Sequence, residues 1–141
     1  MLNSEQIARM KKDRFICGLI GITLDEARQG YARSSLVLRE DHLNGVGIVQ
    51  GGVLYALADY TFAAAANWAE PVVGIETNIS FLNAAKTGKI FAEANEIARS
   101  GHFSVCEVRV TDDAGKLLAH FTGRGYLLKG ESQNRSCPKE D

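Results

Sequence analysis

Three different spacings of apolar residues follow one another along the chain, and each predicts a different kind of element. Residues 4–15 place Ile7, Met10 and Phe15 at roughly helical intervals among charged residues, which indicates a short amphipathic helix. Residues 51–68 are apolar almost all the way round, which predicts a long helix that is buried on most sides. The remaining segments alternate or are rich in β-branched residues, as half-buried strands are.

These remaining segments predict six strands. We expect residues 15–30 and 31–41 to form a hairpin with its turn around Gln29 and Gly30. Four consecutive short strands follow the long helix, and such a run favours an antiparallel sheet. Their expected positions are residues 72–83, 89–101, 102–115 and 116–129.

The order of the elements predicts an α+β fold, in which an antiparallel six-stranded sheet wraps around one long central helix and a short N-terminal helix packs outside. The 141 residues make one domain by size. We divide the chain into the N-terminal helix (1–14), the main domain (15–129) and a polar tail (130–141) that we expect to be disordered. Such a sheet leaves one edge and part of the helix uncovered, so two copies are expected to pair.

Composition and charge narrow the classes of function. The formal net charge is -1, whereas a nucleic-acid-binding domain would be basic. No apolar run follows the N-terminal charges, and the longest apolar stretch is short and rich in alanine. We therefore expect no signal peptide, no membrane span and a cytoplasmic location. The three cysteines are far apart and are expected to be reduced thiols, and neither they nor the three histidines show the spacing of a metal site.

A single carboxylate, Asp59, interrupts the apolar run of residues 51–68. Burial disfavours its ionised form unless a partner compensates. Such an acid can be structural, bonded to the backbone or to Tyr60 of a second copy, or it can be catalytic. The helix begins at Gly51 and Gly52, where unpaired N–H groups could stabilise an oxyanion and glycine would let a carbonyl approach closely. The same pair can also be no more than a helix start.

Asp59 and Gly51 are too far apart to act on one carbonyl within one chain. Eight residues of helix separate them by roughly 12 Å along the axis, whereas catalytic contacts are about 3 Å long. If both act together, Asp59 must meet Gly51 of another copy, with the two helices antiparallel about a two-fold axis.

The segment that contains these residues resembles a known family. Residues 42–59 read HLNGVGIVQGGVLYALAD, which is similar to the signature H-x-N-x-x-G-x-x-H-G-G-x-x-x-x-L-x-D of the hotdog-fold acyl-CoA thioesterases, in particular the branch associated with phenylacetic acid degradation. The resemblance covers the order of elements over residues 15–129. It implies a homo-oligomer, a dimer or tetramer with a shared active site, that hydrolyses an acyl-CoA to free acid and CoA without metal or cofactor.

The resemblance also implies roles for individual residues. Asp59 would act as general base for water or as nucleophile, the backbone N–H of Gly51 would polarise the thioester carbonyl, and Asn44 would help to hold the water or the carbonyl. One position departs from the signature, because Gln50 stands where the family usually has His. An amide can still donate and accept hydrogen bonds but does not titrate, so we expect Gln50 to orient a loop or the carbonyl.

Further contacts follow from the same resemblance. Several relatives place a Ser or Thr on the strand after the helix to assist the water, where this chain offers Gly74, with Glu76 and Thr77 nearby. Basic residues among the implied contacts suit the phosphates of CoA, although surface charges are usually only solvated. Substrate and CoA contacts are expected at His42, Gly52, Gly74, Phe81, Asn83, Lys86, Arg99, Ser100, Gly101, His102 and Phe103, with Arg124 and Lys129 as further candidates.

Alternatives remain at the level of residues and of function. His42 could simply hold a loop, and Asn44 could be an Asx-turn residue. A hotdog dehydratase or hydratase would need a catalytic His, and the long helix contains none. A non-catalytic acyl-CoA binder or ligand sensor would agree with Gln50 but not with a retained Asp59. The acyl group stays open, because the aromatic side chains of the long helix can line a pocket or belong to the core.

Overall fold

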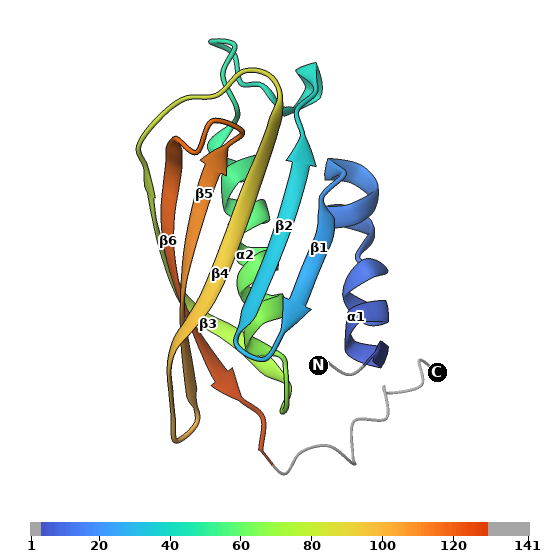
Figure 1. The fold of residues 1–141 in the computed structure, drawn as a ribbon, viewed down its shortest axis with the longest axis vertical. Coiled ribbons are helices and arrows are strands. Elements are labelled where there is room, and N and C mark those ends of the chain that lie inside the picture. Colours follow the sequence, from blue (N-terminus) through green and yellow to red (C-terminus); the bar gives the residue numbers. More distant parts are fainter. Residues whose placement is uncertain (1–3, 130–141) are drawn as a thin grey trace, which may run out of the picture.

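The computed structural model describes residues 4–129. Six antiparallel strands form one sheet that curves around the helix α2 (Gly51–Ala66), and the shorter helix α1 (Ser4–Lys11) lies outside it near one edge (Figure 1). The predicted α+β architecture is confirmed. The strands are β1 (Thr23–Arg28), β2 (Tyr31–Val37), β3 (Val72–Phe81), β4 (Lys89–Ser100), β5 (Phe103–Asp112) and β6 (Leu117–Leu127), in the sheet order β1-β2-β4-β5-β6-β3.

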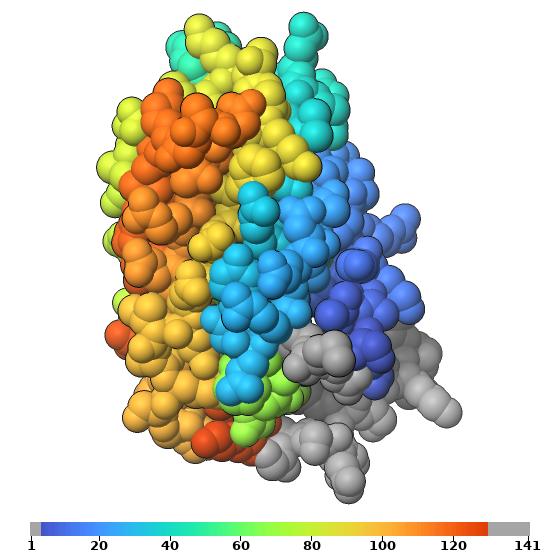
Figure 2. Space-filling model, in the orientation of Figure 1, coloured from blue at the N-terminus to red at the C-terminus, as the bar shows by residue number. Residues whose placement is uncertain are grey.

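The core lies between α2 and the concave face of the sheet. Leu57, Ala58 and Phe62 of α2 are almost completely buried, and so are the alanines of β2 and β4 that face them. These small side chains let the strands approach the helix closely. On the opposite, convex face of the sheet, the strands form a continuous surface (Figure 2). The apolar pattern of residues 51–68 is thereby explained, since the helix is covered on most sides.

Glycines on β6 provide room for the buried side chain of Phe62 and the partly buried side chain of Val72. A Cβ atom at Gly123 would lie 2.8 Å from the Phe62 ring, and one at Gly125 would collide with the side chain of Val72. Both approaches are far closer than a normal carbon contact, so only glycine allows β6 to pass so close to its neighbours.

The first part of the predicted hairpin is wrong. Residues 14–20 do not extend into β1 but form a short π-helical segment, η1 (Arg14–Ile20). The Asp13 side chain accepts a hydrogen bond from the N–H of Ile16 at its start, and Gly21 ends it with a positive φ of 91°. Ile16 and Ile20 are four residues apart and both are buried in the core, so their spacing was helical although their residue type favours strands.

The other boundaries agree more closely with the pattern. The helix α2 ends at Ala66 and not at Trp68, and a 3₁₀ turn, η2 (Glu40–His42), lies in the loop that precedes it. Cys17 and Cys106 are free thiols, and burial raises the pKa of Cys106 to about 12. The predicted tail and Cys137 lie outside the described residues. No helix within residues 4–129 is long and apolar enough to span a membrane.

One sheet edge and one face of α2 are left uncovered. The edge strand β3 exposes Val73, Ile75 and Phe81 to solvent. Beside it, the polar face of α2 presents Tyr55 and Asp59, both partly exposed. An unpaired edge strand with exposed apolar side chains is typical of a surface that pairs with a second copy. The order of elements along the sequence predicts such an uncovered edge.

Candidate active site

The start of α2 leaves one backbone N–H group without a partner. Gln50 caps the helix, because its Oε1 accepts a hydrogen bond from the N–H of Gly52. The N–H of Gly51 donates to no group within residues 4–129. A Cβ at Gly51 would lie 3.2 Å from the Phe81 ring, and one at Gly52 would lie 2.7 Å from Gln50 Oε1. The glycine pair therefore keeps the capped helix start open and its first donor accessible.

Asn44 shapes the loop that precedes the helix. Its Oδ1 accepts hydrogen bonds from the backbone N–H groups of Val46 (3.0 Å) and Ile48 (3.3 Å), which is an Asx-type turn. Its amide nitrogen has no partner within the described part of the chain. The side-chain oxygen of Asn44 thus forms the Asx turn that the sequence offered as an alternative to a role in the site. Its amide N–H groups remain available to a ligand.

His42 is bound on both ring nitrogens by the backbone. Nδ1 accepts a hydrogen bond from the N–H of Arg39 (3.0 Å), so Nε2 carries the proton and donates to the carbonyl of Ile20 (2.8 Å). The side chain is 3% exposed. His42 anchors the loop to η1, and no polar atom of its ring is free for the substrate contact that the resemblance implies.

Asp59 lies on the half-buried face of α2 with no compensating group. Its carboxylate has neither a hydrogen-bond nor an ion-pair partner within residues 4–129. Burial raises the pKa of this carboxyl above the usual value of an aspartic acid. It faces a cavity of about 380 Å³ between α2 and β3, which we call the β3 cavity. An unpaired, partly desolvated carboxylate is a stronger base than an exposed one, which suits proton transfer.

A bulge in β3 brings a hydroxyl group into the β3 cavity. The register against β6 shifts between Gly74 and Glu76, and Thr77 lines the cavity together with Asp59. Thr77 Oγ1 is 2.9 Å from the hydroxyl of Tyr55, one turn before Asp59 on α2. Gly74 supplies only backbone there. Gly74, Glu76 and Thr77 all line the cavity, and Thr77 is the one of the three that brings a hydroxyl group there. Tyr55, whose place in a pocket or in the core the sequence left undecided, lines the same cavity.

The two groups expected to act on one carbonyl occupy separate cavities. Asn44, Gly51, Phe81 and Asn83 line a cavity of about 410 Å³ at the start of α2, whereas Asp59 faces the β3 cavity further along the helix. The structure thus assembles the expected site residues into two halves. Neither half alone contains both a base and an oxyanion donor.

The residues expected to contact CoA also divide into two groups. Phe81 is the last residue of β3, and Asn83 and Lys86 follow it, at the end of the molecule where α2 begins. The β4–β5 turn with Ser100 and Gly101 lies at the opposite end (Figure 1). In that turn, the ring of His102 stacks on Tyr126 at 5.2 Å and Phe103 packs edge-on against the same ring at 6.0 Å. Lys129 is exposed, and Arg124 approaches Glu76 at 3.8 Å.

Arg99 is held within the protein by several partners. Its guanidinium donates to Glu96 (2.8 Å), to Glu70 (2.8 Å) and to the carbonyl of Ala66 at the end of α2 (3.2 Å), and it lies 4.4 Å from the centre of the Trp68 ring. The hydrogen bond from Arg99 holds the pKa of Glu70 below its usual value. Only 17% of the Arg99 side chain and 10% of Glu96 are exposed. This network ties β4 to the end of the central helix and occupies the group that was expected to bind phosphate.

We expect Arg99→Met to lower the free energy of unfolding by about 3 kcal/mol, because it leaves the carboxylate of Glu96 buried without its cation. Urea denaturation measures this loss. Arg124→Met is the matched control, and its exposed pair with Glu76 should contribute less than about 1 kcal/mol. A variant of Arg99 that keeps its stability and loses affinity for CoA would instead support the phosphate-binding role.

Comparison with known proteins identifies the family to which this chain belongs. Residues 46–119, from the loop before α2 into β6, match the family model of the thioesterase superfamily. The chain belongs to the thioesterase superfamily. The predicted resemblance, the hotdog fold and the class of thioester hydrolase are confirmed.

Several relatives match over most of their length. A protein of Archaeoglobus fulgidus that is assigned provisionally to the esterases is 31% identical over 131 residues, covering 89% of this chain and 85% of its own. Human acyl-coenzyme A thioesterase 13 is 31% identical and covers 82% of this chain and 86% of its own. Among solved structures, a mutant of the phenylacetic acid degradation protein PaaI from Thermus thermophilus aligns with a TM-score of 0.78 at 33% identity, over 82% of this chain and all of its own.

Proposed function

We propose that this protein hydrolyses an acyl-CoA thioester to the free acid and CoA, in a site formed by two copies of the chain. The observation that carries the proposal is the unpaired carboxylate of Asp59, which faces a cavity that also contains the hydroxyl groups of Tyr55 and Thr77. A structural acid at this position would have a hydrogen-bond partner to compensate its burial. The name of the human relative supports acyl-CoA as the substrate class.

Asp59 can promote hydrolysis in either of two ways. As a general base, its carboxylate takes a proton from water while the water oxygen bonds to the thioester carbonyl carbon. As a nucleophile, its oxygen attacks that carbon directly and forms a mixed anhydride, which water then hydrolyses. In both, the carbon–sulfur bond breaks and CoA leaves as the thiol after it receives a proton. Thr77 lies beside Asp59 and can hold the attacking water by a hydrogen bond.

The helix start supplies the donors that stabilise the oxyanion. The N–H of Gly51 has no partner within residues 4–129, and the dipole of α2 favours negative charge at that end. The amide nitrogens of Gln50 and Asn44 also have no partner in this part of the chain and lie close to the helix start. Gln50 therefore combines two tasks. Its side-chain oxygen caps the helix, and its side-chain nitrogen can donate a hydrogen bond to the thioester carbonyl. Neither task needs a side chain that titrates.

A second copy completes the site. Two chains that pair along β3 would place their α2 helices antiparallel, so that Asp59 of one copy faces Gly51 of the other. The same pairing would cover Val73, Ile75 and Phe81 and remove an unpaired sheet edge. It would also bring the loop with Asn83 and Lys86 of one copy toward the β4–β5 turn of the other, joining the two groups of residues expected at CoA.

We expect Asp59→Asn to lower the rate of thiol release from acyl-CoA thioesters by about a hundredfold or more. The asparagine keeps the shape of the side chain but cannot accept the proton or attack the carbonyl. The measurement is turnover of a panel of alkyl- and aryl-CoA thioesters at equal concentrations of folded protein. The exposed acid Asp25 gives the control, Asp25→Asn, which should retain full turnover. A wild-type protein that binds acyl-CoA but releases no thiol from any member of the panel would support a non-catalytic binder instead.

The same variant has an expected effect on stability with a defined sign. Burial raises the pKa of Asp59 in the folded state, so its ionised form is destabilising, and Asp59→Asn should melt at an equal or higher temperature at pH 7. The difference should disappear below the unfolded pKa of about 3.9, where the wild-type carboxyl is neutral as well. A lower melting temperature of the variant at neutral pH would mean that the carboxylate has a structural partner.

The sharing of the site between two copies can be tested with Gly51→Pro. Proline removes the backbone N–H and adds a ring, whose Cβ would lie 3.2 Å from the Phe81 ring, so this side chain must shift slightly. Proline is tolerated at the first position of a helix, and the ψ of 134° at Gln50 is compatible with a following proline. Gly51→Pro and Asp59→Asn should each be inactive alone. Mixed and re-associated, they should recover roughly a quarter of wild-type turnover, since half of the dimers are then mixed and each has one intact site. No recovery from verified mixed dimers would contradict the shared site.

The hydrogen bond between Tyr55 and Thr77 should hold the Thr77 hydroxyl in position. Tyr55→Phe keeps the ring but removes this bond, and we expect kcat to fall about three- to tenfold with KM little changed. Thr77→Val should reduce kcat at least as much. In a double-mutant cycle, Tyr55→Phe should add little to Thr77→Val, because the group that Tyr55 orients is already lost. Equal effects of Tyr55→Phe in both backgrounds would show that the two residues act independently.

A further inference from the structure

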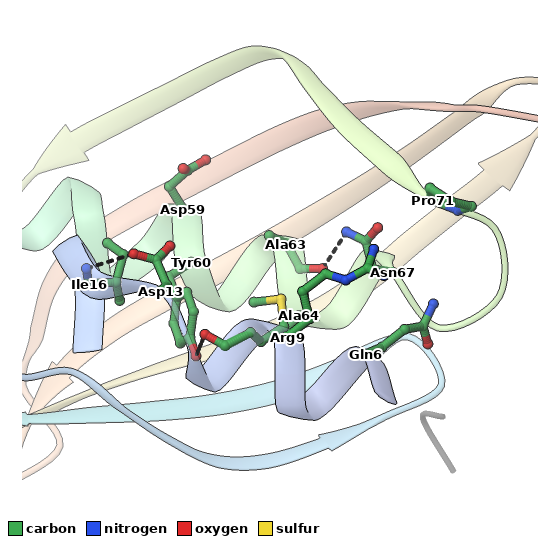
Figure 3. A pocket seen from close by; sticks show the side chains of 11 residues that line it. Gln6, Arg9, Asp13, Ile16, Asp59, Tyr60, Ala63, Ala64, Asn67 and Pro71 are labelled. Atoms are coloured by element: carbon green, nitrogen blue, oxygen red, sulfur yellow. Dashed lines mark hydrogen bonds between the residues drawn. The ribbon is translucent and has the colours of Figure 1, made fainter. Parts of the chain in front are cut away.

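A second elongated cavity runs along the other side of the Asp59 face, between α2 and α1. It has a volume of about 340 Å³, and we call it the α1 groove. The two helices are tied together because the Tyr60 hydroxyl donates to the carbonyl of Met10 (3.0 Å). The Gln6 amide also approaches the carbonyl of Ala69 (3.5 Å), in the segment that follows α2. Figure 3 shows Asp13 and Ile16 near one end of this groove and Gln6 and Pro71 near the other.

The α1 groove and the β3 cavity share a wall. Asp59, Ala63 and Asn67 line both, and since they are spaced by four residues they form one ridge along α2. In Figure 3 the carboxylate of Asp59 points away from α1 and toward β3. A thioester carbonyl held at Asp59 would thus have the hydroxyl groups of the β3 cavity on one side and the α1 groove on the other.

The walls of the α1 groove are apolar where they face the ridge. Met10, Ile16, Ala63 and Ala64 contribute carbon surface. The polar side chains around them are mostly engaged in the protein itself. Asp13 caps η1 through Ile16, Tyr60 binds Met10, and Asn67 accepts from the N–H of Val72 at 2.7 Å. A ligand in this groove would therefore gain mainly from the burial of its own apolar surface.

Gln6 closes the end of the groove that is remote from Asp59. Its Oε1 is buried and has no hydrogen-bond partner within the described residues. The ridge from Asp59 to Asn67 extends eight residues along α2, which is roughly 12 Å of helix axis. The groove thus runs from the ridge at Asp59, whose carboxylate lies on the β3 side, to the amide of Gln6.

We propose that the α1 groove binds the acyl group of the substrate, and that its shape selects an unbranched alkyl chain of medium length. This proposal rests on the proposed thioesterase function. The two sides of the ridge differ in a way that supports this proposal. The polar groups that can bind water and the thioester carbonyl lie on the β3 side, and the apolar walls lie on the α1 side. An extended chain follows the ridge from Asp59 toward Gln6, whereas a compact ring would leave the far end of the groove empty.

A larger residue at the far end should shorten the preferred chain. We expect Gln6→Trp to lower the ratio of kcat/KM for octanoyl-CoA to kcat/KM for butyryl-CoA by about tenfold or more, because the last carbons of the longer chain lose their place. Thiol release is measured for acetyl-, butyryl-, octanoyl- and dodecanoyl-CoA. Lys11→Trp is the matched control, since Lys11 is on α1 but exposed and outside the groove, and it should leave the ratio unchanged.

The outcomes separate this proposal from the function on which it rests. A wild-type protein that hydrolyses neither a thioester of this series nor an aryl-CoA contradicts the proposed function, whereas one that hydrolyses only aryl-CoA thioesters contradicts the α1 groove alone. A wild-type protein that hydrolyses octanoyl-CoA while Gln6→Trp keeps the wild-type ratio contradicts the α1 groove alone, and so does a wild type that prefers acetyl-CoA. If Gln6→Trp does not fold, as judged by circular dichroism, Met10→Trp blocks the middle of the same groove and should lower the same ratio; an unchanged ratio there overturns the proposal equally.

Discussion

The need to bury an almost wholly apolar helix governs the structure. The sheet curves around α2 because Leu57, Ala58 and Phe62 have no polar side to offer to water, and alanines and glycines on the strands let the backbone approach. A six-stranded sheet does not close around a helix, so one ridge of α2 stays partly open. On this ridge lies Asp59, and the two cavities beside it exist because neither β3 nor α1 packs against the ridge completely.

The same constraint sets the electrostatics of the site. Asp59 is surrounded on its own helix by apolar side chains, and the described part of the chain brings no cation to it. Charged networks do form elsewhere, as Arg99, Glu96 and Glu70 show at the other end of α2. The carboxylates of Glu96 and Glu70, which help to hold the fold together, are thus paired with a cation, whereas the carboxylate of Asp59 is not. A partly buried acid that is left uncompensated in this way is typical of a functional site.

Much of the fold could be read from periodicity, because α2 and, apart from a few bulges, the strands after Pro71 follow their spacings. The π-helical segment was missed since the β-branched Ile16 and Ile20 favour strands by type, while only the cap at Asp13 and the turn at Gly21 reveal the helix. Thr77 could not be selected from the sequence, because a bulge decides which residues of β3 face the helix. The partners of Arg99 could not be read from the sequence, because Glu70 and Trp68 are distant from it along the chain and meet it only in the folded protein.

The helix α1 differs from the rest of the fold in how it is held. None of its residues is fully buried, and its hydrogen bonds to the rest of the described chain include those at Met10 and Gln6. Segments with little buried apolar surface open at a small fraction of the free energy that global unfolding requires. The wall formed by α1 can therefore move away from α2 while the sheet and the central helix stay folded. The protein thus combines a rigid half, which carries the carboxylate and the donors, with a wall of low local stability.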